Sequence, residues 1–193
     1  MKVKYTFYIV GVGGTGSLFA RDLPQLLIGT NHQMVLIDGD IVAKKNVARQ
    51  SYQLQDVGLN KAIALAKKIN SFYDIQCEAI DKYITLNELT ERIKKDSSVP
   101  VIVGCVDNDA TRKLLEETFK KQRAAVYIDS ANSAYSGNVF VTVKSNKDIH
   151  GKLRSEVYDL KNDKKPTDKS CQEYVSEGNL QYMVTNAKMA VCI

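Results

Sequence analysis

The chain has 193 residues, of which 44% are hydrophobic and 25% charged, and this length and composition suit one folded domain with a full core. No run approaches the roughly 20 apolar residues that a membrane helix needs. The first apolar run, residues 5–10, leads into glycines rather than into a signal-peptide cleavage site. Composition therefore argues against membrane insertion and secretion, and we expect a cytoplasmic protein.

The charge and the cysteines exclude further classes. The formal net charge is +5, from 27 basic and 22 acidic residues, and no block of Lys and Arg favours a nucleic-acid partner. The four cysteines are scattered and form no CxxC pair. We therefore expect free thiols, and neither a disulfide scaffold nor a zinc site.

Strand and helix signals alternate along the first three-quarters of the chain. In order, the patterns predict a strand at 5–10, a helix at 17–27, a strand at 34–37, a helix at 60–69, a strand at 75–80, a helix at 86–93, a strand at 99–106, a helix at 109–119 and a strand at 126–128. Pro24 predicts a kink or an early end in the first helix. In the second helix, Ile63, Ala66 and Ile69 share one side. The alternation predicts an α/β fold, Rossmann-like and doubly wound around a mostly parallel sheet.

The pattern changes near residue 136. Residues 138–143 alternate like a strand with one side in solvent, which predicts an antiparallel extension of the sheet. A polar stretch without periodicity follows, and residues 182–191 predict a helix without a stop signal. We divide the chain into a nucleotide-binding core (1–143), a polar loop (144–170) and a C-terminal helical segment of the same domain (171–193). The missing stop signal suits either a C-terminally truncated piece of a longer protein or a short form.

A glycine-rich turn carries the first functional signal. Gly11, Gly13, Gly14 and Gly16 lie between the first strand and the first helix, where glycines allow a tight turn and the helix N-terminus attracts phosphate. Asp38 ends the second strand, where an acidic side chain commonly binds ribose hydroxyls. Up to this point an NAD-dependent dehydrogenase and an ATP-using enzyme are equally compatible with the sequence.

The following segments favour the breaking of a phosphoanhydride. Arg49 and Lys61 supply cations of the kind that stabilise charge on phosphate oxygens, and Asp107, at the end of a buried strand, could hold Mg²⁺. Each residue also has a plainer interpretation. Asp38 and Asp40 could form turns, Arg49 could pair with a surface acid, Lys61 could be an exposed helix lysine, and Asp107 could cap the next helix.

Four motifs in order resemble those of one family. GxGGxGS, LIDGDIVxxxNVxRQ, DVGLNK and CVDNxxTR are similar to the ThiF-type adenylyltransferases, relatives of ubiquitin-activating enzymes, and within them to the ThiF-like proteins of PRTRC gene clusters. The resemblance covers residues 4–137, with a weaker echo at 170–171 and 181–186. It implies that the four glycines form the nucleotide loop, that Asp38 binds the ribose and that Asp40 also belongs to the cofactor site. Asn46, Arg49 and Lys61 would face the phosphates, and Asp107 would position Mg²⁺ and the α-phosphate.

The resemblance also implies a reaction and partners. The C-terminal glycine carboxylate of a ubiquitin-like or sulfur-carrier protein would attack the α-phosphorus of ATP. A JAB-type metallopeptidase and a second copy of the chain are implied as partners. Three features depart from the family: an N-terminal arginine and a paired CxxC zinc motif are absent, and Cys171 is a weak candidate for a transferring cysteine. The alternatives are an NAD(P)-dependent Rossmann oxidoreductase and a non-catalytic module that binds nucleotide or a partner.

Overall fold

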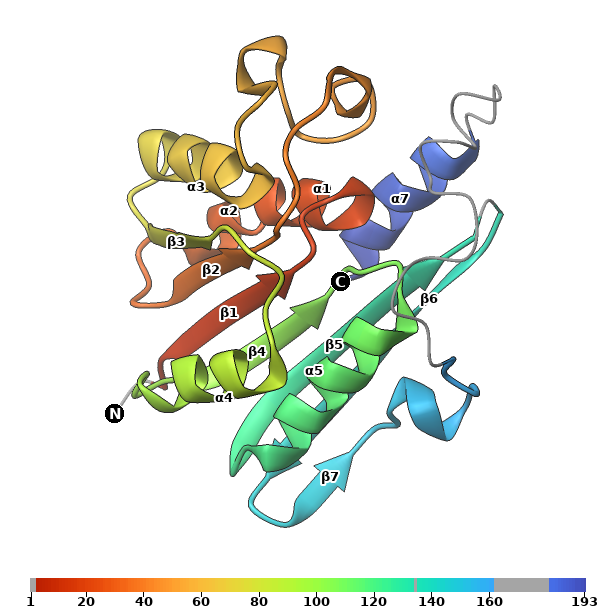
Figure 1. Ribbon diagram of the computed structural model, residues 1–193. Coiled ribbons are helices and arrows are strands. Elements are labelled where there is room, and N and C mark those ends of the chain that lie inside the picture. Colours follow the sequence, from red (N-terminus) through yellow and green to blue (C-terminus); the bar gives the residue numbers. More distant parts are fainter. Residues whose placement is uncertain (1–2, 134, 162–180) are drawn as a thin grey trace.

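The computed structural model describes residues 3–133, 135–161 and 181–193, so Cys171 lies outside the described part. A single sheet of seven strands has the order β3-β2-β1-β4-β5-β6-β7, in which β1 to β5 are parallel and β6 and β7 antiparallel (Figure 1). The strands are β1 (Tyr5–Val10), β2 (Gln33–Ile37), β3 (Gln76–Ile80), β4 (Val99–Gly104), β5 (Ala124–Asn132), β6 (Gly137–Ser145) and β7 (Asp148–His150). The predicted doubly wound, mostly parallel sheet with an antiparallel extension is confirmed.

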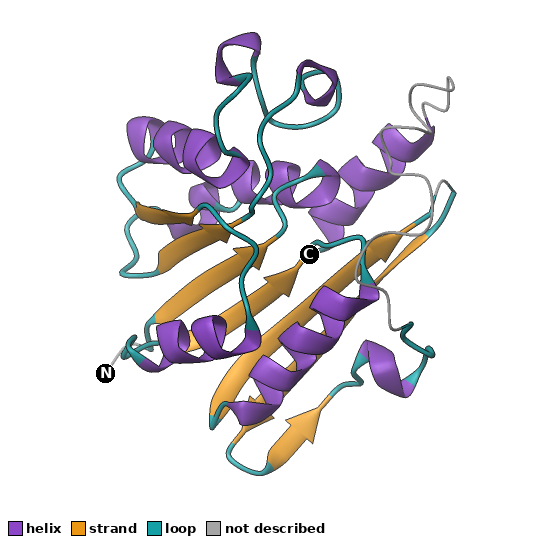
Figure 2. Cartoon of the chain, in the orientation of Figure 1, coloured by secondary structure: helices purple, strands orange, loops and turns teal. Residues whose placement is uncertain are grey.

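Helices cover both faces of the sheet (Figure 2). On one face lie α1 (Gly14–Asp22), α2 (Pro24–Leu27), α3 (Lys61–Phe72) and α7 (Gln181–Cys192), and on the other α4 (Leu86–Lys94) and α5 (Asp109–Lys121). Three 3₁₀ turns complete the described elements: η1 (Lys44–Asn46), η2 (Leu54–Asp56) and η3 (Arg154–Glu156). Among the described residues, no helix has the length and apolarity required to span a bilayer.

Each face of the sheet has its own core because successive strand residues point to opposite sides. Ile9, Leu36 and Val103 pack with α1 and α3, and the second cluster joins Tyr8 and Ile102 to α4 and α5. Capping side chains mark the residues at which three of the helices begin. Asn60 caps α3, Thr85 and Glu88 form a capping box on α4, and Asn108 caps α5.

Of two predictions about the helices, one needs correction and one is confirmed. Ile63 does not share the buried side of α3; it is 43% exposed, and the buried residues of that helix include Ala62 and Leu65. The break near Pro24 is confirmed, because α1 ends at Asp22 and Pro24 opens α2 at its first position, where a missing N–H costs nothing.

The stretch predicted as a polar loop is ordered in its first half. It contains the end of β6, then β7 and η3. Arg154 and Leu153 of this segment are buried, and Ser155 donates to the carboxylate of Glu116 on α5. Sequence periodicity missed this because long-range polar contacts, rather than a repeating apolar pattern, hold the segment.

Candidate functional site

The glycine turn between β1 and α1 lies at the carboxyl end of the sheet, beside the point where the strand order reverses between β1 and β4. Ligands of open α/β sheets bind at this place. Gly11 has a φ of +84°, and a Cβ on Gly16 would lie 1.9 Å from the Gly11 carbonyl oxygen, so packing requires both glycines. A Cβ on Gly13 would meet only the Gln50 amide nitrogen, at 4.0 Å. The missing Gly13 side chain therefore leaves the first turn of α1 accessible to a ligand.

Asp38 holds the glycine turn from the end of β2. Its Oδ2 accepts a hydrogen bond from the Val12 N–H at 2.8 Å, and its Oδ1 accepts one from the Asp40 N–H at 2.8 Å. Burial raises the pKa of Asp38, against the opposing charge of Lys61 and these two hydrogen bonds. Each carboxylate oxygen keeps a further lone pair, so Asp38 can shape the turn and still accept from a ribose hydroxyl.

Asp40 and Lys61 form an ion pair beside Asp38. The Lys61 ammonium lies 2.7 Å from Asp40 Oδ2, and the lysine side chain is only 5% exposed. Tyr83, in the loop after β3, donates its hydroxyl to the other oxygen of Asp40. Burial alone would raise the pKa of Asp40, but the hydrogen bonds from Lys61 and Tyr83 outweigh it and lower the pKa. Lys61 is therefore not the exposed helix lysine of the plainer interpretation.

The loop after β2 brings further side chains to the turn. Gln50 lies next to Gly13, the Ser51 N–H donates to Ser17 Oγ at 3.1 Å, and the Tyr52 hydroxyl donates to the Val12 carbonyl at 2.7 Å. Arg49 immediately precedes this clamp and is buried. The buried Arg49 guanidinium therefore belongs to a residue that lies next in sequence to residues contacting the glycine turn and α1.

Asn46 has a structural role. It is fully buried in η1, and its Oδ1 accepts from the Ala43 N–H at 2.7 Å. Its Nδ2 makes no hydrogen bond within the part of the chain that the structure describes. Among the described residues, no hydrogen bond joins Asn46 to the glycine turn, so its role toward phosphate stays a prediction.

Asp107 follows β4 and is exposed. Its charge contributes to a pKa of about 12 for Tyr83, which is raised first by the hydrogen bond to Asp40, then by burial and by the charges of Asp40 and Asp38. The charges of Asp38, Asp40 and Asp107 thus act on the same tyrosine, and we call these three carboxylates the acidic rim. Asn108, rather than Asp107, caps α5, since its side chain accepts from the Thr111 N–H at 2.8 Å.

Comparison with known proteins identifies the family. The model of the ThiF family matches residues 3–191. The chain belongs to the ThiF family. Ubiquitin-like modifier-activating enzyme 5 of Branchiostoma floridae is 31% identical over 149 residues, which cover 71% of this chain and 36% of that protein. The Xenopus laevis protein of the same name is 30% identical over 147 residues, covering 70% and 36%. The chain thus spans about a third of the length of these relatives.

Solved structures show the same ThiF fold. PaaA superimposes with a TM-score of 0.63 at 20% identity, covering 98% of this chain and 53% of that one. The tRNA N6-threonylcarbamoyladenosine dehydratase TcdA of E. coli has a TM-score of 0.50 at 26% identity, covering 60% of this chain and 46% of that one.

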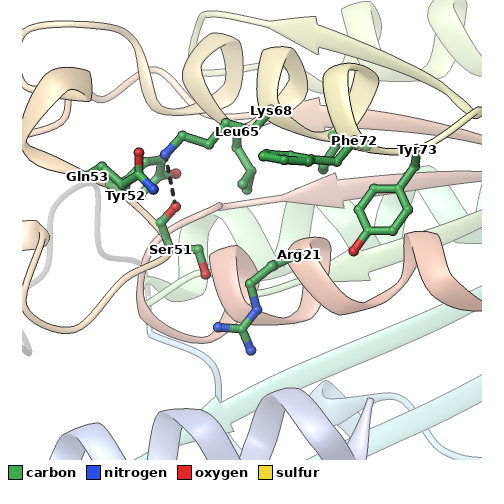
Figure 3. Close-up of a pocket in the computed structure, with 9 residues that line it drawn as sticks. Arg21, Ser51, Tyr52, Gln53, Leu65, Lys68, Phe72 and Tyr73 are labelled. Atoms are coloured by element: carbon green, nitrogen blue, oxygen red, sulfur yellow. Dashed lines mark hydrogen bonds between the residues drawn. The ribbon is translucent and has the colours of Figure 1, made fainter.

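This ThiF family member also has a pocket that the sequence did not indicate. A cavity of about 340 Å³ lies between α1, the loop at 51–53 and α3, with aromatic walls from Tyr52, Phe72 and Tyr73 (Figure 3). Its two cations are engaged: Arg21 pairs with Asp22, and Lys68 pairs with Asp56 and lies 3.5 Å from the Ser51 carbonyl. Tyr52 lines this pocket, and its hydroxyl donates to the Val12 carbonyl of the glycine turn.

Several residues around the site escaped the sequence reasoning. Tyr83, Gln50 and Asn186 contact the acidic rim or the glycine turn. Gln50 lay inside a motif and Asn186 at the end of the weak C-terminal echo, so signals existed for both. Cys105 is partly buried, packed against the core and beside Gly16, and burial raises its pKa to about 12. Among the residues that the structure describes, no three His, Cys, Asp or Glu side chains gather to form a metal site.

Proposed function

We propose that the chain binds ATP and adenylates the C-terminal glycine carboxylate of a small ubiquitin-like or sulfur-carrier protein. The observation that carries the proposal is the open first turn of α1, which is tied to Asp38, together with the buried ammonium of Lys61, whose charge acts on the Asp38 carboxylate. A helix N-terminus next to a buried cation suits a polyphosphate. Membership of the ThiF family and the similarity to ubiquitin-like modifier-activating enzymes support adenylation.

In the proposed reaction, a carboxylate oxygen of the carrier forms a bond to the α-phosphorus of ATP. The bond from that phosphorus to the bridging oxygen breaks, and pyrophosphate leaves with the electron pair. The carboxylate is already ionised, so no proton moves and no general base is required. The chain contributes by positioning and by electrostatic stabilisation: Asp38 orients the ribose, and Arg49 and Lys61 stabilise charge on the phosphates.

Asp107 would hold Mg²⁺ in this scheme. The residues fit a cation held mainly by phosphate and water, because Asp107 is an exposed carboxylate at the rim of the site and Mg²⁺ commonly uses one or two carboxylates beside substrate phosphates. When bound, the ion neutralises charge on the phosphates. Asp40 lies at the same rim but is engaged by Lys61 and Tyr83.

The partners belong to the same proposal. The similarity to modifier-activating enzymes supports a ubiquitin-like or sulfur-carrier partner. A homodimer and a JAB-type metallopeptidase are proposed on the family resemblance alone. A cytoplasmic location suits the free thiols of Cys77 and Cys105.

A thermal-shift panel tests nucleotide choice. The protein is heated with MgATP, with ATP and a chelator, with NAD and with NADP. At about 100 times the dissociation constant a ligand adds about 2.7 kcal/mol, on the order of 5–10 °C in the midpoint for a domain of this size. We expect a shift with MgATP that shrinks in chelator. A shift with NAD or NADP alone would point to an oxidoreductase and overturn the proposal.

Variants and an exchange assay test the chemistry. Arg49→Ala and Lys61→Ala should abolish the MgATP shift, whereas Lys67→Ala, an exposed lysine on α3, should leave it unchanged. Adenylation is measured as exchange of radiolabelled pyrophosphate into ATP, stimulated by a ubiquitin-fold protein that ends in Gly-Gly. MgATP binding without exchange for any such protein would favour a non-catalytic module.

A further inference from the structure

The C-terminal helix contacts the glycine turn through one buried side chain. Asn186 of α7 is 2% exposed. Its Oδ1 accepts hydrogen bonds from Thr15 Oγ1 at 3.2 Å and from Asn132 Nδ2 at 3.0 Å. Thr15 belongs to the first turn of α1 and Asn132 ends β5. The side chain therefore joins three elements at the edge of the proposed nucleotide site.

These contacts fix the orientation of the Asn186 amide. Asn132 also donates from Nδ2 to the Ser133 carbonyl at 3.4 Å, so its Nδ2 faces both that carbonyl and Asn186. Reversing the Asn186 amide would place two NH₂ groups against each other. Oδ1 of Asn186 consequently faces Thr15 and Asn132, and Nδ2 faces the turn.

The nitrogen of this amide points at the backbone of Gly14. A Cβ on Gly14 would lie 2.5 Å from Asn186 Nδ2, so the glycine makes room for the amide. Within the described part of the chain, Nδ2 makes no hydrogen bond. A buried donor without an acceptor is costly and uncommon in native proteins, so an acceptor from outside the described residues is expected here.

We propose that Asn186 Nδ2 donates to a phosphate oxygen of the bound nucleotide, so that α7 completes the phosphate site. The inference rests on the proposed function. The missing acceptor lies beside the first turn of α1, where the backbone N–H groups and the helix dipole attract negative charge. An anionic oxygen also makes the stronger hydrogen bond, compared with a neutral carbonyl. Gln50 lies beside Gly13 on the same turn, so two amide side chains frame the phosphate position.

Two substitutions at Asn186 test the hydrogen bond donated by Nδ2 separately from the other contacts of the side chain. Asn186→Asp keeps the shape and both accepted hydrogen bonds but replaces the donor with a negative oxygen. Asn186→Ala removes the donor without adding charge. Val191→Ala is the matched control, since Val191 lies on the same helix and is 84% exposed. Thermal midpoints of the ligand-free variants establish that each folds.

The readout is calorimetric titration with MgATP and with adenosine, without any carrier protein. A lost hydrogen bond to a charged group weakens binding about 10- to 100-fold, so both Asn186 variants should lose that much MgATP affinity and keep adenosine affinity within about twofold. Val191→Ala should bind both ligands like the wild type. Should Asn186→Ala not fold, the near-isosteric and uncharged Asn186→Leu takes its place as the variant that removes the donor without adding charge.

Three results would overturn the inference while leaving the proposed function intact. The first is an unchanged MgATP affinity in both variants. The second is a loss confined to Asn186→Asp, which would indicate an effect of charge alone, and the third is an equal loss for MgATP and adenosine, which would indicate a disturbed site. A wild type that binds neither ligand would remove the proposed function and the inference together.

Discussion

The carboxylate of Asp38, at the end of β2, accepts a hydrogen bond from the backbone N–H of Val12, in the turn that follows β1. The two residues are 26 positions apart, and the 2.8 Å contact joins neighbouring parallel strands just beyond their carboxyl ends. The acidic residue that sequence assigns to the ribose therefore also shapes the phosphate turn. Asp38 couples the two halves of the proposed nucleotide site before any ligand arrives.

Asp38→Asn should change the pH dependence of stability in a defined direction. Because burial raises the native pKa of Asp38, the native state binds this proton more tightly than the unfolded state. Asp38 thus makes the wild type lose stability as pH rises from the ordinary value of 3.8 through the native pKa. Asparagine removes this component, so the free energy of unfolding of the variant minus that of the wild type should increase with pH. Urea unfolding of both proteins from pH 4 to pH 8 measures it, and a difference that decreases with pH would contradict the assignment.

Gly13 and Gly16 should respond differently to alanine. A Cβ on Gly16 would lie 1.9 Å from the Gly11 carbonyl oxygen, so the backbone must move, and overpacking of this kind costs about 1–3 kcal/mol or more. A Cβ on Gly13 meets only the Gln50 amide at 4.0 Å. We expect Gly16→Ala to lower the thermal midpoint clearly, and Gly13→Ala to lower it less while weakening MgATP binding. Equal destabilisation by the two substitutions would show that Gly13 serves packing instead.

The described cysteines should differ in reactivity toward iodoacetamide at pH 8. Burial raises the pKa of Cys77 and of Cys105 to about 12, and the thiolate is the reactive form. Cys192 is exposed. In the native protein, peptides with Cys192 should be alkylated within the time that leaves Cys77 and Cys105 unmodified, and denaturant should remove the difference. Mass spectrometry of the digested protein reads the pattern, and rapid native labelling of Cys105 would contradict its place in the core.

Local patterns were sufficient to predict most of the fold. Strand β1 has the predicted bounds, and the alternation of strands and helices gave the parallel sheet. Helical spacing alone misplaced Ile63, because residues that share a side of α3 need not face the sheet. The 3₁₀ turn η3 is held in place by the contact between Ser155 and Glu116, which are 39 positions apart. A local sequence pattern cannot predict a contact over that distance.

The candidate site, like the fold, could be predicted from local sequence patterns only in part. The glycine turn, Asp38 and Lys61 lie in contiguous motifs, so the sequence could single them out as candidates. Tyr83 and Asn186 reach the site by tertiary packing, from the loop after β3 and from α7. The sequence motif around Lys61 could be identified, but the burial of its ammonium against Asp40 could not be predicted. This burial depends on how α3 packs against the turn after β2.

A buried cluster around Asp129 supports the strand end that precedes Asp107. Asp129 has no exposed surface, and its carboxylate accepts from Arg112 Nη1 at 2.5 Å and from Arg154 Nε. Arg112 also donates to the Val106 carbonyl, next to Asp107. One carboxylate thus compensates two buried guanidinium groups and, through Arg112, holds the loop after β4.

Asp129→Ala should therefore be among the most damaging single substitutions. It leaves the buried Arg154 without the carboxylate it pairs with and, of the described carboxylates, leaves Arg112 with only Asp109, whose Oδ1 lies 3.6 Å from Arg112 Nε. Breaking a buried pair costs about 3–5 kcal/mol. Replacing all three side chains, as Asp129→Leu, Arg112→Met and Arg154→Met, removes the uncompensated charges and should recover most of that stability.

The triple variant should still bind MgATP more weakly than the wild type, because the Val106 carbonyl has lost its donor. Urea unfolding and MgATP titration measure the two effects, with Lys82→Ala, which removes an exposed ion pair to Glu88, as the control that stays close to the wild type. A triple variant no more stable than Asp129→Ala would show that the cluster is held by shape rather than by charge compensation.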